Sequence, residues 1–157
     1  MAARSSRSRR RFDGSEDSLS PPEEFVLYLD ENLCNSSAIC ETLKRLGIRF
    51  ERHVRYFSRG TPDETWLPLV GRNRWILLTA DKRIRYSFLE KRALERNAVG
   101  EFVFTSGNMS GQEMATALDT ALPKMKRVCR KFRRPFVASI TRIGEVHLRW
   151  PKTKPFK

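Results

Sequence analysis

The residues best suited to chemistry in this sequence are five acids beside its most apolar segments: Asp30, Glu31, Asp63, Glu64 and Asp81. The first two follow the apolar run 25–29, the last follows the run 75–79, and the middle pair opens a predicted helix that leads into the second run. Carboxylates that converge repel one another, and a hard divalent cation such as Mg²⁺ or Mn²⁺ relieves that repulsion by taking oxygen ligands. Such a metal suits phosphodiester hydrolysis, because it activates water and neutralises charge on the phosphate.

Each acid also has a purely structural explanation. Asp63 and Glu64 suit the first turn of a helix, where the helix dipole favours negative charge. Asp81 suits the N-cap of the helix that follows it. Asp30 is harder to explain in this way, because an acid that ends a buried strand needs a compensating partner. Taken together at matching strand ends, the acids favour a functional site.

The strands that would position these acids are short and apolar. The runs 25–29 and 75–79 predict strands that are buried on both faces. Residues 48–54 alternate apolar and charged side chains, as a strand near the edge of a sheet does. A further strand is expected at 101–105, and residues 136–141 and 145–150 predict a closing antiparallel hairpin.

Helices are expected between the strands. One begins at Ser36 or Ser37 and runs to Leu46, where Gly47 ends it. A second has Thr61 as its N-cap, Pro62 at its first position and Glu64 completing a capping box, and Pro68 makes it short or bent. The others are expected at 84–98 and at 110–132, the last with a break or kink at Pro123. Alternating strands and helices indicate an α/β domain with a mainly parallel sheet.

The charge of the chain points to a polyanionic partner. Its 157 residues carry a formal net charge of +13, and the domain without residues 1–20 keeps +11. Nucleic acid is the ordinary partner for such a surface, and an anionic membrane or an acidic protein is the alternative. The basic stretches 124–134 and 72–74 are candidates for contacts with phosphates, and the first also mixes aromatic with basic residues, as RNA-binding surfaces often do. The residues expected to contact RNA are Arg72, Arg74, Lys82, Lys126 and Arg130.

Composition indicates the domain boundaries and the cellular compartment. Residues 1–22 are rich in Arg, Ser and acids and predict a disordered basic tail, which leaves residues 23–157 as the domain. No apolar run is long enough for a membrane span or a secretory signal, so we expect a cytoplasmic protein without membrane contact. Cys34, Cys40 and Cys129 have no zinc spacing and are expected to be free thiols. His53 and His147 are expected to be strand or surface residues.

Three of these segments resemble a known family in their order and spacing. Asp30-Glu31-Asn32-Leu33 follows an apolar strand, Gly60-Thr61-Pro62-Asp63-Glu64 opens a helix with acids, and Leu77-Leu78-Thr79-Ala80-Asp81-Lys82 ends a second strand. Together they resemble the compact PIN-like domains, which include the VapC-like toxins of bacterial toxin–antitoxin pairs. The likeness covers 25–104 and extends plausibly to Trp150.

The resemblance implies a three-layer α/β/α domain and a ribonuclease that depends on Mg²⁺ or Mn²⁺. By position, Asp30, Asp63 and Asp81 would be the catalytic and metal-binding acids. Glu31, Asn32 and Glu64 are secondary candidates. A fourth acid of PIN domains has no clear counterpart, since neither Glu90 nor Glu101 matches its place. The implied partners are RNA, an antitoxin protein and a second copy of the chain in a homodimer.

Two other functions compete with an endoribonuclease. A degenerate PIN-like scaffold would bind RNA or another partner without cleaving it. A receiver-like phospho-acceptor domain also places acids at strand ends, but it needs a Lys after a later strand, and the strand at 101–105 is followed by Ser106 and Gly107. The placement of Asp30, Asp63 and Asp81 around one metal-sized space would decide for the nuclease.

Overall fold

The protein is built around one six-stranded sheet. The computed structural model describes residues 24–80, 88–105 and 108–151, and the strand order is β2-β1-β3-β4-β5-β6. The strands are β1 (Val26–Leu29), β2 (Arg49–Arg52), β3 (Ile76–Thr79), β4 (Gly100–Phe104), β5 (Phe136–Ile140) and β6 (Val146–Trp150). β1 to β5 are parallel and β6 is antiparallel to β5. The predicted α/β fold, mainly parallel with a C-terminal hairpin, is therefore confirmed.

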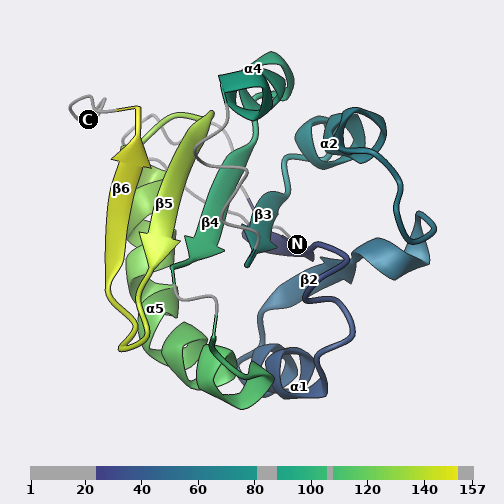
Figure 1. Cartoon of the computed structure of the whole chain (residues 1–157). Helices are drawn as coiled ribbons and strands as arrows, with labels where there is room; N and C mark the ends of the chain where they lie inside the picture. The colour runs from purple at the N-terminus through teal and green to yellow at the C-terminus, as the bar shows by residue number, and fades with distance from the viewer. Residues whose placement is uncertain (1–23, 81–87, 106–107, 152–157) are drawn as a thin grey trace, which may run out of the picture.

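Helices cover both faces of this sheet (Figure 1). α1 (Ser37–Arg45) and α5 (Gly111–Lys131) pack together over one face, and α2 (Asp63–Arg72) and α4 (Phe88–Asn97) pack together over the other. Two apolar clusters fill the spaces between the layers. The fold is thus a three-layer α/β/α arrangement.

The central strands explain why the apolar runs are continuous. All four residues of β1 and all four of β3 are buried. Leu27 and Leu29 join the cluster under α1 and α5, whereas Tyr28 joins the cluster under α2 and α4. A strand that is covered on both faces needs apolar side chains at every position, so alternation disappears.

The starts of α1 and α5 are fixed by serine caps. The side chain of Ser36 accepts a hydrogen bond from the amide of Ile39, as the sequence predicts. Ser110 and Glu113 form a full capping box at the start of α5, in which each side chain bonds the backbone of the other. Gly47, just after α1, adopts φ 70°, which is the left-handed backbone that favours glycine.

Two expectations about the segment after β2 are wrong. The strand ends at Arg52, and His53–Arg55 form the 3₁₀ helix η2, because β2 pairs only with β1 and β1 ends opposite Arg52. α2 begins at Asp63 with Pro62 as its N-cap, and Pro62 has no side-chain cap to offer. The Thr61 hydroxyl donates instead to the carbonyl of Ser58, so the predicted capping box with Glu64 does not form.

The two helical prolines do not interrupt their helices. Pro68 lies within the ten residues of α2, and α5 continues for 21 residues through Pro123, so of the break or kink predicted there the break does not occur. Leu118, Leu122 and Met125 flank Pro123 on the buried face of α5. Burial on both sides of the proline offsets the one backbone hydrogen bond that it removes. None of the helices in the described ranges has the length and apolarity needed to cross a membrane.

The connections of the chain place the site. From β1 the chain moves to β2 on one side, and it then returns to β3 on the other side of β1. The carboxyl ends of β1 and β3 therefore lie side by side where the direction of winding changes. Ligands of open parallel sheets bind at such a switch point.

The turn between β5 and β6 offers a test of how the hairpin packs against α5. Gly144 has φ 86°, and a Cβ built on it would lie 2.6 Å from the Cβ of Thr120 on α5, whereas a Cβ on Gly47 would meet nothing within 4 Å. We expect Gly47→Ala to lower the free energy of unfolding by about 1–2 kcal/mol through backbone strain alone. Gly144→Ala should lower the free energy of unfolding by roughly 1–3 kcal/mol more than Gly47→Ala does, because of the clash with Thr120. Urea unfolding measures both, and equal losses would contradict the contact with α5.

Candidate active site

Asp30 lies at the switch point and joins β1 to β3. It directly follows β1, and only 4% of its surface is exposed. Its Oδ1 accepts hydrogen bonds from the amides of Asn32 (3.1 Å) and Leu33 (3.2 Å), and its Oδ2 accepts one from the hydroxyl of Thr79 at the end of β3. These donors stabilise a negative carboxylate in a position that is nearly closed to water.

Tyr28 lies two residues before Asp30 and on the opposite face of β1 from Leu27 and Leu29. Burial, reinforced by the charge of Asp30, raises the pKa of the Tyr28 hydroxyl far above its ordinary value. The hydroxyl therefore keeps its proton, and its oxygen lies 2.6 Å from Nδ1 of His53, within hydrogen-bonding distance. The carboxylate of Glu31, 3.8 Å from Nε2, favours the neutral tautomer that carries its proton at Nε2, and in that tautomer the Tyr28 hydroxyl donates to Nδ1.

His53 is almost completely buried, with 1% of its surface exposed, among the aromatic rings of Tyr28, Phe57 and Trp66. Its Nε2 has no hydrogen-bond partner among the described residues and lies 3.8 Å from Oε1 of Glu31. Burial lowers the pKa of His53, while the charges of Glu31 and Asp63 oppose that change. Two acids named from the sequence therefore act on one buried imidazole.

Glu31 fastens the loop after β2 to the end of β1. Its Oε1 accepts a hydrogen bond of 2.9 Å from the amide of Gly60, and its side chain is about one-third exposed (35%). Gly60 has φ 83° and leads into the start of α2, where Asp63 is the first helical residue. The carboxyl edge thus holds one buried acid, Asp30, and beside it a partly exposed acid, Glu31.

This acidic switch point lies within a segment that matches a known family. Residues 25–106 match the family described as a PIN like domain, which is more than half of the chain. The chain belongs to the PIN-like domain family. PIN-like domains are a family of nucleases, and they typically bind metal. No curated protein and no solved structure matches the chain.

The PIN-like domain brings some of the predicted site residues together. Asp30 lies beside Thr79 of β3, and Glu31 and Asp63 both act on His53. Asn32 and Glu64 are exposed, the first just after Asp30 and the second in the first turn of α2. Asp81 and Lys82 lie outside the described residues.

The predicted RNA-binding residues that the structure describes lie away from this edge. Arg72 is in the last turn of α2 and Arg74 lies two residues before the first residue of β3, so both are at the amino end of that strand. Lys126 and Arg130 are on the C-terminal half of α5, where Lys126 lies 5.7 Å from the ring centre of Phe25. None of these four is a neighbour of Asp30 in the sheet.

Glu101 does not supply a fourth acid at the edge. It is the second residue of β4, is completely buried, and pairs in register with Leu77 and Val137 in the middle of the sheet. The metal expected for a PIN domain would need oxygen ligands at the carboxyl end. In the described ranges, no group of three His, Cys, Asp or Glu side chains is placed to hold a metal ion. The described acids thus fit a metal site in chemical type and do not by themselves complete one.

Sequence reasoning overlooked three polar residues of the edge: Tyr28, His53 and Thr79. Thr79 is the one hydroxyl residue in the apolar segment 75–79, which is a signal that could have been used. Tyr28 reads as an ordinary core residue, and His53 reads as part of an alternating strand. Their connection depends on two residues that are 25 positions apart in the chain coming to the same place.

The bond between Thr79 and Asp30 can be tested with two matched variants. Thr79→Val keeps the shape of the side chain and removes the donor to a nearly buried carboxylate, so we expect the free energy of unfolding to fall by about 1–3 kcal/mol. Thr79→Ser retains the hydroxyl, so its free energy of unfolding should fall by less. Equal stability of the valine variant and the wild type, measured in urea, would show that this bond does not hold β1 to β3.

The buried imidazole predicts a pH dependence. The unfolded chain protonates His53 near the ordinary pKa of 6.5, whereas the folded chain does so only at lower pH. The unfolded state therefore binds more protons in this window, and the free energy of unfolding should fall as the pH drops from about 7.5 to about 5.5. His53→Phe should reduce this slope in urea titrations, and His147→Gln, which changes an exposed histidine, should preserve it. A slope that follows His147 would contradict the assignment.

Proposed function

We propose that this PIN-like domain is an endoribonuclease that depends on Mg²⁺ or Mn²⁺. The observation that carries the proposal is the nearly buried carboxylate of Asp30 at the switch point between β1 and β3, in a fold whose family consists of nucleases. The net charge of +13 supports a polyanionic substrate. The cytoplasmic setting expected from the composition is part of this proposal.

In this proposal Asp30, Asp63 and Asp81 hold the metal. Asp81 follows β3 in the sequence with one residue between them, and β3 is the neighbour of β1, so the sequence and the topology support its approach to Asp30. When bound, the metal would supply activation of water and neutralisation of charge on the phosphate. Thr79 and the amides of Asn32 and Leu33 hold the carboxylate of Asp30 in a fixed orientation, which is the preorganisation that such a site needs.

The residues next to the three acids would shape the site and are not its primary metal ligands. Glu31 holds the Gly60 loop, which leads into the helix that carries Asp63. Tyr28 and His53 stay neutral under this loop and fill the space beneath it with aromatic surface. Lys82 would neutralise the RNA backbone beside Asp81. We further propose a toxin-like role, in which a cognate antitoxin protein restrains the nuclease.

One observation favours a second function. Both oxygens of Asp30 already accept hydrogen bonds within the protein, and the described residues contain no trio of metal-binding side chains. An acid that serves only to hold β1 to β3 would leave a scaffold that binds RNA without cleaving it. This alternative differs from the nuclease in two properties: the scaffold does not cleave RNA, and its stability does not respond to metal.

Charge-removing variants at the two strand ends separate these functions. Asp30→Asn and Asp81→Asn should each abolish cleavage of RNA in Mn²⁺ or Mg²⁺, because each removes a proposed ligand. Asp30→Asn should also lower the melting temperature without metal, because the amide NH2 cannot accept the hydrogen bond that Oδ2 of Asp30 takes from the Thr79 hydroxyl. The decisive quantity is therefore the rise in melting temperature on adding Mn²⁺, which reports binding to the folded state. The wild type should show this rise and both variants should lose it.

The matched control is Glu95→Gln, which removes one exposed charge from α4. It should retain both cleavage and the response to Mn²⁺. Unchanged cleavage in Asp30→Asn and Asp81→Asn would overturn the nuclease proposal. A wild type that binds RNA, fails to cleave it and shows no thermal response to either metal would establish the binding module instead.

A further inference from the structure

A second site lies on the opposite side of the sheet from β2, between α5 and the edge strand β6. An open groove of about 510 Å³ runs between these two elements. Lys124, Arg127 and Lys131 line it from the helix, and residues 146–149 of β6 line it from the strand. Among the described residues that line the groove there is no acid.

The three helical cations form a row. Spacings of three and four residues place Lys124, Arg127 and Lys131 on one face of α5, over a length of roughly 10 Å at the helical rise of 1.5 Å per residue. None of the ion pairs found among the described residues involves them. Like charges at these spacings destabilise a helix, so the row carries a repulsion that an anion would relieve.

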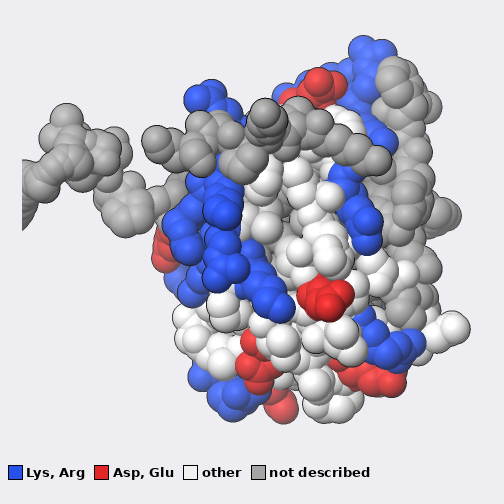
Figure 2. Space-filling view, turned by 90° about the vertical axis from the view of Figure 1, so that its left-hand side faces the viewer, with Lys and Arg blue, Asp and Glu red and all other residues white. Residues whose placement is uncertain are grey.

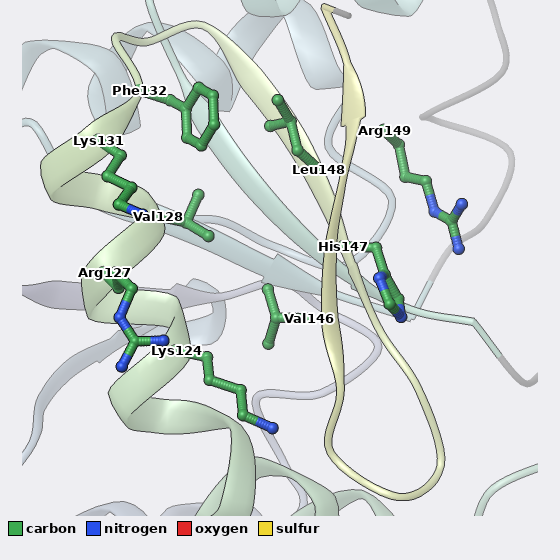
Figure 3. A pocket seen from close by; sticks show the side chains of 9 residues that line it. All are labelled: Lys124, Arg127, Val128, Lys131, Phe132, Val146, His147, Leu148 and Arg149. Carbon is green, nitrogen blue, oxygen red and sulfur yellow. The ribbon is translucent and has the colours of Figure 1, made fainter. Parts of the chain in front are cut away.

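The floor of the groove is apolar. Val146 and Leu148 point from β6 toward α5, where Val128 and Phe132 meet them, while His147 and Arg149 project from the other side of the strand (Figure 3). All four apolar side chains are only partly buried. Figure 2 views the molecule from this side and shows a band of basic residues beside an uncharged strip. A row of cations therefore borders an accessible apolar surface that includes one aromatic ring.

We propose that this groove binds a single-stranded segment of RNA, with its phosphates along Lys124, Arg127 and Lys131 and a base against Phe132. A strand of nucleic acid carries a charge about every 3.4 Å in duplex geometry, so a row of about 10 Å spans two to three phosphates. Cations along the backbone combined with an aromatic surface for bases are the features of non-specific single-strand binding sites. The choice of RNA over DNA rests on the proposed function.

The groove would anchor RNA at a distance from the acidic edge. Four strand spacings separate β1 from β6 in the sheet, which amounts to about 19 Å at roughly 4.8 Å per strand. The two sites therefore cannot share one nucleotide. A substrate that occupies both needs about six nucleotides or more at 3.4 Å each.

Binding of a fluorescently labelled 12-nucleotide oligouridine in EDTA tests this inference without cleavage. Lys124→Gln/Arg127→Gln removes two cations of the row and should weaken binding at least tenfold. It should also reduce the log–log salt slope by about 1.4, since each phosphate on a single strand contributes about 0.7. The melting temperature should hold or rise, because a like-charge repulsion is removed. The matched control Lys44→Gln/Arg96→Gln removes one Lys and one Arg from exposed positions on α1 and α4 and should keep the wild-type affinity.

A second variant separates RNA from an acidic protein. Phe132→Leu keeps an apolar side chain and removes the ring, so it should weaken oligouridine binding about fivefold and leave binding of an oligoglutamate peptide unchanged. Equal RNA affinity of the groove variant and its control would overturn the inference. A groove variant that loses binding of oligoglutamate and retains binding of oligouridine would also overturn the inference, because the groove would then serve an acidic protein.

These outcomes are distinct from those of the nuclease test. A wild type that never cleaves RNA, but whose affinity for it depends on Lys124 and Arg127, would reject the nuclease and support the groove. A wild type that cleaves through Asp30 and Asp81, and whose groove variant binds RNA like its control, would support the nuclease and reject the groove.

Discussion

The carboxylate of Asp30 is the constraint on which the carboxyl edge of this domain depends. It lies nearly out of reach of water at the point where the winding of the sheet reverses, and it accepts hydrogen bonds from two backbone amides and from Thr79. A charge in such a position must be satisfied by fixed donors. Those donors set the turn after β1 and the approach of β3, so the ligand-binding edge and the centre of the sheet share one polar connection.

A second layer of polar contacts follows from this charge. Asp30 adds to the burial that keeps Tyr28 protonated, Tyr28 donates to Nδ1 of His53, and His53 presents Nε2 toward Glu31. Glu31 in turn holds the amide of Gly60, next to the segment that enters α2. A buried neutral histidine beneath a partly exposed acid thus connects the first strand to the helix that carries Asp63. The proposed metal acids rest on this connected support, with aromatic rings packed around it.

Negative and positive charge are separated across the sheet. Asp30 and Glu31 lie at the carboxyl end of β1, where we propose the metal, whereas α5 and β6 form a groove lined by cations at the far side. A strongly basic protein can hold acids in one place because the parallel strands converge their carboxyl ends there. The same sheet leaves β6 as an edge, and the long α5 beside it presents every third or fourth residue to the groove. Both proposed sites are therefore consequences of strand order.

The sequence by itself determined the strands, the parallel sheet and the position of Asp30 at a strand end, because continuous apolar runs bounded by polar residues have few alternatives in a buried sheet. It also determined the serine cap of α1 and the stop at Gly47, since these depend on neighbouring residues alone. It was wrong at Thr61, and at Pro123 the break that it allowed as one alternative to a kink does not occur, because in both places a local signal competes with contacts elsewhere. It indicated the basic stretch 124–134 as a phosphate contact and singled out Lys126 and Arg130, whereas Lys124, Arg127 and Lys131 are the residues that face β6. Only the tertiary structure decided these matters and the link between Tyr28 and His53, because each depends on which face of an element meets a segment that is remote in the chain.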